Sequence, residues 1–353
     1  MKYLLWIFLI SLILFRYFTT RPVYQNNDLI RLTGTVYSDP IVYENARYLK
    51  LASLKIYVPL YPEISYGSRV VLEGEVVDGK IKKGKIISVE ENVGTMANFR
   101  KKIISFYQSS LPEPYAGLLA GITLGSKGAL TSDFWEKVKY VGVAHVVVAS
   151  GTNVTFVVMF LISTLTLVLP RRKAIPFVIL GIILYLFISG FDAPLIRSAV
   201  MAGVAFLGVE SGRLINTWRN LVVTALLMLI YNPGWLIDVG FLLSFVSTAS
   251  IMLFEKRVRS KLLMLPKILR EGMSTSFAAQ IGVAPILFVT FGQFNIWSPI
   301  INALVLWTIP MIMIFGAVGG VVGLVVPVLG KIVLYLSYPL LWWFVKIVTI
   351  FTV

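Results

Sequence analysis

The sequence predicts a polytopic α-helical membrane protein, with about 8–9 transmembrane or re-entrant helices and a small N-terminal all-β domain. Of the 353 residues, 57% are hydrophobic and only 14% are charged, and the mean hydropathy of +0.83 lies well above that of a soluble chain. From residue 143 onward, apolar segments follow one another almost without interruption, whereas residues 28–91 alternate apolar and polar side chains. The first pattern is typical of membrane helices and the second of β-strands.

Residues 1–20 are predicted to form an N-terminal transmembrane anchor. An apolar run over residues 4–18 follows Lys2, and Arg16 can extend its charged end to the membrane surface. A signal peptide would look similar, but no small-residue cleavage site of the Ala-x-Ala kind follows the run. We therefore expect the segment to be retained.

Residues 21–95 are predicted to form the all-β domain. Apolar residues recur at every second position, as at Ile30, Leu32, Gly34 and Val36. The pair Asp78-Gly79 lies between two such runs and suits a tight hairpin turn. Four or five strands in about 65 residues make a small β-barrel, for which an OB-like fold is the simplest arrangement. Because this region is nearly neutral, we expect a structural or docking role ahead of strong DNA binding.

Residues 96–142 are predicted to form interfacial amphipathic helices, because none of their apolar stretches is a comfortable full span. Residues 143–353 then form one transmembrane domain. Its apolar segments cover residues 143–169, 174–190, 194–209, 217–231, 236–254, 275–291, 299–325 and 329–350.

The basic residues predict the orientation of these segments. Cytoplasmic loops carry an excess of Lys and Arg, and the run Arg171-Arg172-Lys173, the loop 256–270 and Lys331 can all lie on the cytoplasmic side at once. The N-terminus is then cytoplasmic, while the β-domain and the C-terminus are on the outer side.

Charge and composition limit the chemistry. Residues 21–91 hold ten Lys/Arg and nine Asp/Glu, which leaves twenty-two against eight on the rest of a chain of net charge +15. This excess permits polyanion binding, although cytoplasmic loops alone can explain it.

The chain has no cysteine and a single histidine, His145, so we expect no disulfide, no zinc site and no cofactor. Gly84-Lys85 lacks the loop of a P-loop motif, and we expect no enzymatic activity.

The segment 142–154, GVAHVVVASGTNV, places polar residues where a membrane helix should be. Such groups face either a water-filled path or a helix-packing contact, and the segment alone does not decide between these. A nucleophilic pair of Ser150 and His145 is a third interpretation, but residues five apart lie about 140° apart around a regular helix. Gly142 and Gly151 are the expected points at which the helix breaks.

Several stretches together resemble the ComEC family of competence proteins. The family has Gly-x-Ala-His followed by Ser-Gly, which is similar to the segment around His145 and Ser150. Further similar stretches follow in order: APLIRSAVMA at 193–202, NPGWLIDVGFLLSF at 232–245 and AAQIGVAPILFVTFGQFNIWSPIINALVLWTIP at 278–310. The resemblance covers residues 112–310. It departs at Asn153, where the family usually has histidine, and at Leu242, where it has glutamine.

The resemblance implies a channel in the bacterial cytoplasmic (inner) membrane that passes single-stranded DNA into the cell during natural transformation. The implied path is lined by His145, Ser150, Gly151, Asn153, Arg197, Gln280, Gln293 and Asn302. Arg197 has an alternative role as an anchor near the outer surface, paired with Asp192. Asp238 is expected to cap the helix that follows it.

The resemblance also implies partners. These are the lipid bilayer, a cytoplasmic helicase-like ATPase of the ComFA type near the loop 255–271, and an outer-face DNA receptor of the ComEA type. Many members carry a metallo-β-lactamase-like domain, which the single histidine of this chain cannot build, so we expect any strand degradation from a separate nuclease. Two alternatives to the channel stay open: a secondary transporter of a small anion, and a relative with a non-channel role.

Overall fold

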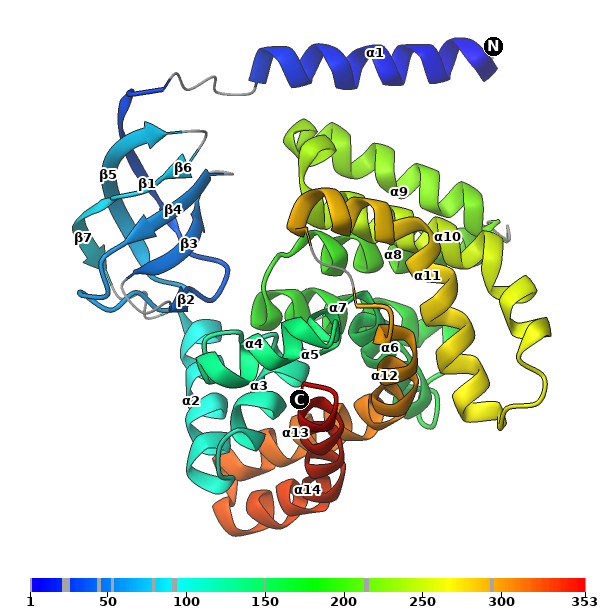
Figure 1. Ribbon diagram of the computed structural model, residues 1–353. Helices are drawn as coiled ribbons and strands as arrows, with labels where there is room; N and C mark the ends of the chain where they lie inside the picture. Colours follow the sequence, from blue (N-terminus) through cyan, green and yellow to red (C-terminus); the bar gives the residue numbers. More distant parts are fainter. Residues whose placement is uncertain are drawn as a thin grey trace.

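The computed structural model describes residues 2–20, 26–42, 46–51, 54–77, 80–90, 94–148, 150–212, 216–292 and 295–352. The chain starts with helix α1 (Lys2–Thr20), continues through a seven-stranded sheet and then forms helices α2 to α14. Figure 1 shows the sheet beside the helices, with α1 lying along α9.

The seven-stranded sheet confirms the predicted N-terminal β-domain. Its strands are β1 (Leu29–Thr35), β2 (Ile41–Val42), β3 (Arg47–Leu51), β4 (Leu54–Val58), β5 (Arg69–Val77), β6 (Lys80–Ile81) and β7 (Lys85–Glu90). They pair in the order β1-β5-β6-β4-β3-β2, and β7 also pairs with β5. Alternate side chains such as Leu49, Ile56 and Leu72 form a buried core. The likeness to an OB fold stays a prediction.

The turn Asp78-Gly79 lies outside the described residues. Val77 and Lys80, the described residues on either side of it, are paired in the sheet.

The helices that follow the sheet have these bounds: α2 (Thr95–Ser110), α3 (Tyr115–Leu124), α4 (Ser132–Tyr140), α5 (Ala144–Val147), α6 (Gly151–Leu165), α7 (Arg171–Ser189), α8 (Ala193–Glu210), α9 (Thr217–Tyr231), η1 (Pro233–Ile237), α10 (Val239–Lys261), α11 (Lys267–Phe291), α12 (Ser298–Val305), η2 (Leu306–Thr308), α13 (Ile309–Val325) and α14 (Pro327–Ile350). Among the described residues, six stretches are long and apolar enough to cross a membrane. They are Ala144–Leu165, Arg171–Ser189, Val239–Lys261, Leu269–Thr290, Ser298–Val325 and Pro327–Ile350. The chain is therefore a polytopic helical membrane protein; the apolar stretches Ala193–Gly208 and Thr217–Tyr231 are shorter.

The short helix α3 differs from the expectation of an amphipathic surface helix. Every residue from Ala116 to Leu124 is buried, and the helix packs against α2, α13 and α14. The Tyr107 hydroxyl of α2 donates a 2.8 Å hydrogen bond to the Gly316 carbonyl of α13 within the same core. Helix α3 is apolar on all sides and therefore has no polar face to turn toward water or headgroups. It is buried for this reason.

Arg100 of α2 joins the sheet to the helices. Its side chain is 2% exposed and forms an ion pair of 2.6 Å with Asp39, in the segment before β2. It also donates to the carbonyls of Leu124 and Ile188, which close α3 and α7. The guanidinium carbon lies 4.4 Å from the centre of the Tyr66 ring.

Tyr66 also connects the β-domain to the helices. Its hydroxyl donates a 2.9 Å hydrogen bond to the Phe187 carbonyl of α7. Burial raises the pKa of Tyr66 to about 12, and the positive charge of Arg100 opposes that rise. The phenol therefore stays neutral at physiological pH and keeps its proton for this bond.

Candidate functional site

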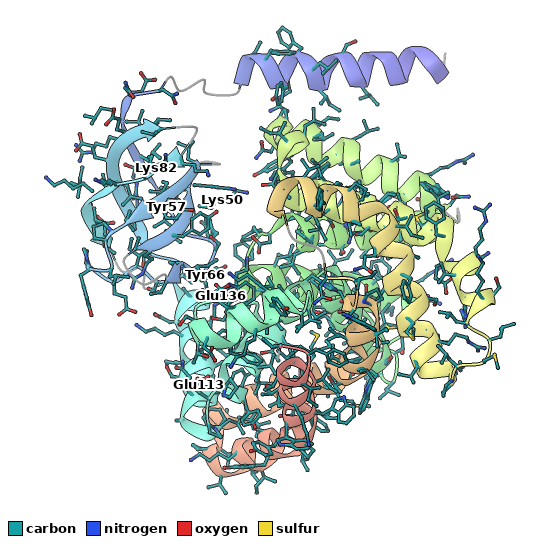
Figure 2. All side chains as sticks on the ribbon, in the orientation of Figure 1. Lys50, Tyr57, Tyr66, Lys82, Glu113 and Glu136 are labelled. Carbon is teal, nitrogen blue, oxygen red and sulfur yellow. The ribbon has the colours of Figure 1, made fainter. Side chains whose placement is uncertain are left out.

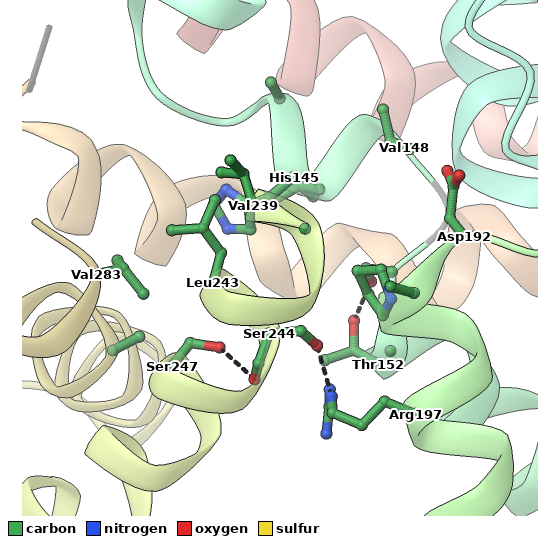
Figure 3. A pocket seen from close by; sticks show the side chains of 18 of the residues that line it. His145, Val148, Thr152, Asp192, Arg197, Val239, Leu243, Ser244, Ser247 and Val283 are labelled. Atoms are coloured by element: carbon green, nitrogen blue, oxygen red, sulfur yellow. Dashed lines mark hydrogen bonds between the residues drawn. The ribbon is translucent and has the colours of Figure 1, made fainter. Parts of the chain in front are cut away.

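A large cavity of about 2900 Å³ lies among the helices and reaches strands β3 and β4 of the sheet. Side chains from β3, α5, α6, α8, α10, α11 and α12 reach its wall. Seven of the eight predicted path residues line it: His145, Ser150, Gly151, Asn153, Arg197, Gln280 and Asn302. The eighth, Gln293, lies outside the described residues. Figure 3 shows how several side chains of this wall converge.

The helix that carries His145 is interrupted as predicted. Gly142 has φ +78°, a left-handed conformation that glycine adopts readily, and follows the end of α4. Helix α5 is a single turn, Val148 is extended, and Ser150 is extended before α6 begins at Gly151. His145 lies on the exposed side of α5, facing the cavity.

Ser150 and Asn153 hold the start of α6 in place. The Ser150 hydroxyl lies 2.6 Å from the Thr152 hydroxyl. It also donates a 3.0 Å hydrogen bond to the side-chain oxygen Oδ1 of Asn153. The Asn153 amide donates a 2.9 Å hydrogen bond to the Ile122 carbonyl of α3. Asn153 is fully buried, so its amide positions α6. The Ser150 hydroxyl is engaged by α6 and not by His145 in this arrangement.

Arg197 of α8 places a cation beside the start of α6. Its Nε donates a 2.5 Å hydrogen bond to the Ser244 hydroxyl of α10, and its Nη1 lies 3.3 Å from the Met201 sulfur. A Cβ atom on Gly151 would come within 2.7 Å of Arg197 Nη2. Glycine at 151 therefore allows the guanidinium to lie close to the N-terminus of α6 (Figure 3).

The alternative pairing of Arg197 with Asp192 is wrong. Asp192 instead forms an ion pair of 3.2 Å with Lys127, in the connection between α3 and α4. Arg197 is turned from Asp192 toward α10, where it meets the Ser244 hydroxyl.

Gln280 of α11 and Asn302 of α12 also line the cavity, and each bonds to a neighbouring residue. The Gln280 amide donates to the Asn295 carbonyl at 3.3 Å, and the Asn302 amide donates to the Ser298 hydroxyl at 3.3 Å. Ser298 in turn donates to the Gly142 carbonyl at 3.3 Å, which ties α12 to the end of α4. Asn302 is 5% exposed, so it acts mainly within this junction.

Asp238 combines the expected cap with a contact that the sequence did not reveal. Its Oδ1 accepts a 3.1 Å hydrogen bond from the Phe241 backbone N–H, which confirms the N-cap of α10. Its Oδ2 lies 2.5 Å from Lys50 Nζ of β3. Burial raises the pKa of Asp238, but Lys50 and the backbone N–H groups together lower it below its usual range. The carboxylate is therefore ionised at neutral pH, and its pair with Lys50 is lost only as the pH falls through that lowered pKa.

The wall also carries hydroxyl groups that were not predicted from the sequence, among them those of Thr152, Ser244 and Thr248. Ser244 lies within the FLLSF stretch that was recognised as a family-like motif. Its hydroxyl was not expected to hold Arg197, because no spacing rule connects two residues 47 positions apart.

The described part of the chain contains no group of three or more His, Cys, Asp or Glu side chains placed to hold a metal ion. The cavity wall carries hydroxyls, amides and cations, together with the carboxylates of Asp192, Asp238 and Glu271.

Comparison with known proteins places this site within a family. The family described as "Competence protein" matches residues 122–353, about two thirds of the chain. The chain belongs to this competence protein family. The resemblance to ComEC proteins is thereby confirmed, and all the described path residues fall within the matched region.

Two relatives are similar to part of the chain. ComE operon protein 3 of Bacillus subtilis is 29% identical over 228 residues, which cover 64% of this chain and 28% of the relative. Competence protein ComA of Neisseria gonorrhoeae is 24% identical over 221 residues, which cover 57% of this chain and 30% of the relative. The match thus spans less than a third of either relative. No solved structure matches the chain.

Proposed function

We propose that this chain forms a membrane passage through which single-stranded DNA enters the cytoplasm during natural transformation. The observation that carries the proposal is the convergence of polar side chains from separate membrane helices on one cavity of about 2900 Å³. The matching family is described as "Competence protein" and one relative is named competence protein ComA, which supports a role in DNA uptake.

A DNA strand needs such a polar path because each nucleotide carries a negative charge. A bare phosphate in hydrocarbon is prohibitively unfavourable. The described wall offers hydroxyls at Ser150 and Thr152 and a cation at Arg197. The start of α6 adds the positive end of a helix dipole beside Arg197.

The size of the cavity favours a polymer over a small anion. Small-molecule sites usually enclose about 300–1,000 Å³, and this cavity of about 2900 Å³ is several times larger. A secondary transporter for a small anion would need a closer-fitting site, and a non-channel role would leave the polar wall without a function.

We infer that the chain acts without catalysing a reaction. Ser150 has no hydrogen-bonded base in the described residues, because its hydroxyl bonds with Thr152 and Asn153. Energy for transport must then come from another protein, such as a helicase-like ATPase of the ComFA type. Lys256, Arg257 and Lys267 are exposed at the α10–α11 connection, where such a partner would dock.

We further propose that the N-terminus is cytoplasmic and that the β-domain and the C-terminus lie outside. A ComEA-type receptor would deliver the strand to the outer side, and a separate nuclease would remove the other strand. The OB-like fold of the sheet is part of this proposal, and residues of strands β3 and β4 line the cavity that the DNA would enter.

The proposal is tested by complementation of a competent host that lacks its own ComEC protein, with a separate nuclease supplied. Uptake of labelled donor DNA should return with this chain and be lost with Arg197→Ala and His145→Ala. Arg172→Ala, at an exposed site on α7 away from the cavity, is the matched control and should support normal uptake. Verified insertion without DNA uptake, together with small-anion flux in proteoliposomes, would favour the transporter instead.

A further inference from the structure

The face of the β3–β4 hairpin that points away from the core of the sheet carries two facing pairs of side chains. Tyr48 lies opposite Tyr57 and Lys50 lies opposite Lys55 in the strand register. The two tyrosine rings are 5.4 Å apart and tilted by 53°. We call these four residues the hairpin patch; their neighbours Leu49 and Ile56 point into the core.

The facing lysines are unfavourable unless an anion accompanies them. Like charges directly opposite one another on neighbouring strands repel. Asp238 neutralises Lys50, whereas Lys55 is exposed and has no ion-pair partner among the described residues. The hairpin patch is thus one negative charge short.

The hairpin patch opens onto the same cavity as the helix residues. Tyr48, Lys50 and Lys55 line this cavity, as does Arg197 of α8. Figure 2 shows Lys50 extending from the sheet toward the helices. Lys127 and Lys139 line the cavity as well, so four lysines contribute to its wall.

We infer that the hairpin patch binds single-stranded DNA where the strand enters the cavity. Backbone phosphates bind Lys55 and replace the Asp238 carboxylate on Lys50, while bases stack on the tyrosines. A basic surface with exposed aromatic rings is the common means of holding single strands without sequence preference. The inference rests on the proposed DNA passage and names the residues that the strand meets first.

The exchange of Asp238 for a phosphate is physically reasonable. The side chains of Lys50 and Asp238 are 45% and 22% exposed, and solvent-exposed ion pairs contribute little net stability. A phosphate can therefore compete for Lys50 without disrupting a buried network. The near-neutral total charge of residues 21–91 conceals this local pair of lysines, which is why a structural or docking role was expected.

Binding of a fluorescent thymidine oligonucleotide to the full chain in zwitterionic lipid nanodiscs tests the inference. The double variant Lys50→Ala/Lys55→Ala should weaken binding about tenfold or more, and should lower the slope of log affinity against log salt by about 1.4, or about 0.7 for each lost phosphate contact. The double variant Lys83→Ala/Lys85→Ala removes the same charge from exposed sites outside the cavity and should change affinity less than about twofold.

Asp238→Asn provides a test that misfolding cannot imitate. Asparagine keeps the N-cap of α10 and removes only the charge that competes for Lys50. We expect tighter oligonucleotide binding, by about threefold or more, because Lys50 is released. Unchanged or weaker binding in this variant, or an unaffected Lys50→Ala/Lys55→Ala variant, would overturn the inference.

These outcomes are separable from the proposed function. If uptake is restored in cells but oligonucleotide affinity is insensitive to the hairpin patch, the passage stands and this entry site is wrong. If the unaltered chain neither binds the oligonucleotide nor restores uptake, both proposals fail.

Discussion

Arg197 and Ser244 join α8 to α10 through a hydrogen bond of 2.5 Å inside the cavity. A hydrogen bond to a charged group contributes about 1.5–3 kcal/mol, so loss of the Ser244 hydroxyl should leave the guanidinium poorly oriented. We expect Ser244→Ala to reduce DNA uptake about tenfold and Arg197→Ala to reduce it further. Uptake of labelled DNA, normalised to the amount of membrane-inserted protein, measures both.

Arg197→Lys separates charge from geometry, because lysine keeps the charge and loses the Nε donor. It should resemble Ser244→Ala. If Ser244→Ala supports normal uptake while Arg197→Ala abolishes it, the hydrogen bond between Arg197 and Ser244 does not contribute to DNA uptake.

Gly151 is expected to tolerate no side chain. A Cβ atom there would come within 2.7 Å of Arg197 Nη2 and would also meet the Ser198 hydroxyl. Overpacking of this kind costs about 1–3 kcal/mol, and moving Arg197 should lower uptake at least as much as Ser244→Ala does. Gly203→Ala is the matched control on α8, since its Cβ would meet no atom within 4 Å; it should be neutral or stabilise the helix by up to about 1 kcal/mol. Equal effects of the two substitutions on uptake would contradict the role of Gly151.

Ser150→Ala distinguishes a cavity wall from a nucleophile. The variant loses neutral hydrogen bonds to Thr152 and Asn153, which contribute about 1 kcal/mol each, while Asn153 keeps its bond to the Ile122 carbonyl. We expect DNA uptake to fall only a few fold in the complementation assay. Complete loss of uptake, with Ser150→Thr active, would point instead to a reactive hydroxyl.

The membrane part of the fold follows from the sequence because its signals are local. Apolar runs bounded by basic residues predicted the long helices, and the alternation around Leu49 and Ile56 predicted strands. The break near Gly142 and Gly151 was also predicted, since glycine within an otherwise apolar segment marks a place where the backbone can turn.

Contacts between distant segments could not be predicted in the same way. Lys50 and Asp238 are 188 positions apart, and Arg100 meets Ile188 across 88 positions. Neither pair has a periodic signature, because each depends on how elements far apart in the sequence pack together. Asn153 and Asn302 both line the cavity, but their contacts with Ile122 and Ser298 could be seen only in the packed structure.

Arg100 should be among the least replaceable residues for stability. Removing one member of a buried ion pair costs about 3–5 kcal/mol, because the remaining charge is left without compensation. Arg100→Ala would leave the buried Asp39 carboxylate without its ion-pair partner. It would also remove the hydrogen bonds to the carbonyls of Leu124 and Ile188. Thermal unfolding of the purified chain in detergent should show a clear loss of stability, whereas exposed Lys101→Ala should leave the midpoint unchanged.

The double variant Arg100→Met/Asp39→Asn tests the cause. It removes both charges, so it should be less destabilised than Arg100→Ala alone. A double variant that is destabilised as much as Arg100→Ala would assign the effect to the lost carbonyl contacts and not to an uncompensated Asp39.

The orientation of the β-domain can be tested because the chain contains no cysteine. Ser88 is exposed on β7 and does not line the cavity, so Ser88→Cys introduces one accessible thiol with little disturbance. If the β-domain lies outside, this thiol should react with a membrane-impermeant maleimide in intact spheroplasts. A cysteine at exposed Lys261, at the end of α10, should react only after the membrane is opened, because the α10–α11 connection is basic and is expected in the cytoplasm. The reverse pattern would invert the whole topology, and the hairpin patch would then face DNA leaving the cavity on the cytoplasmic side.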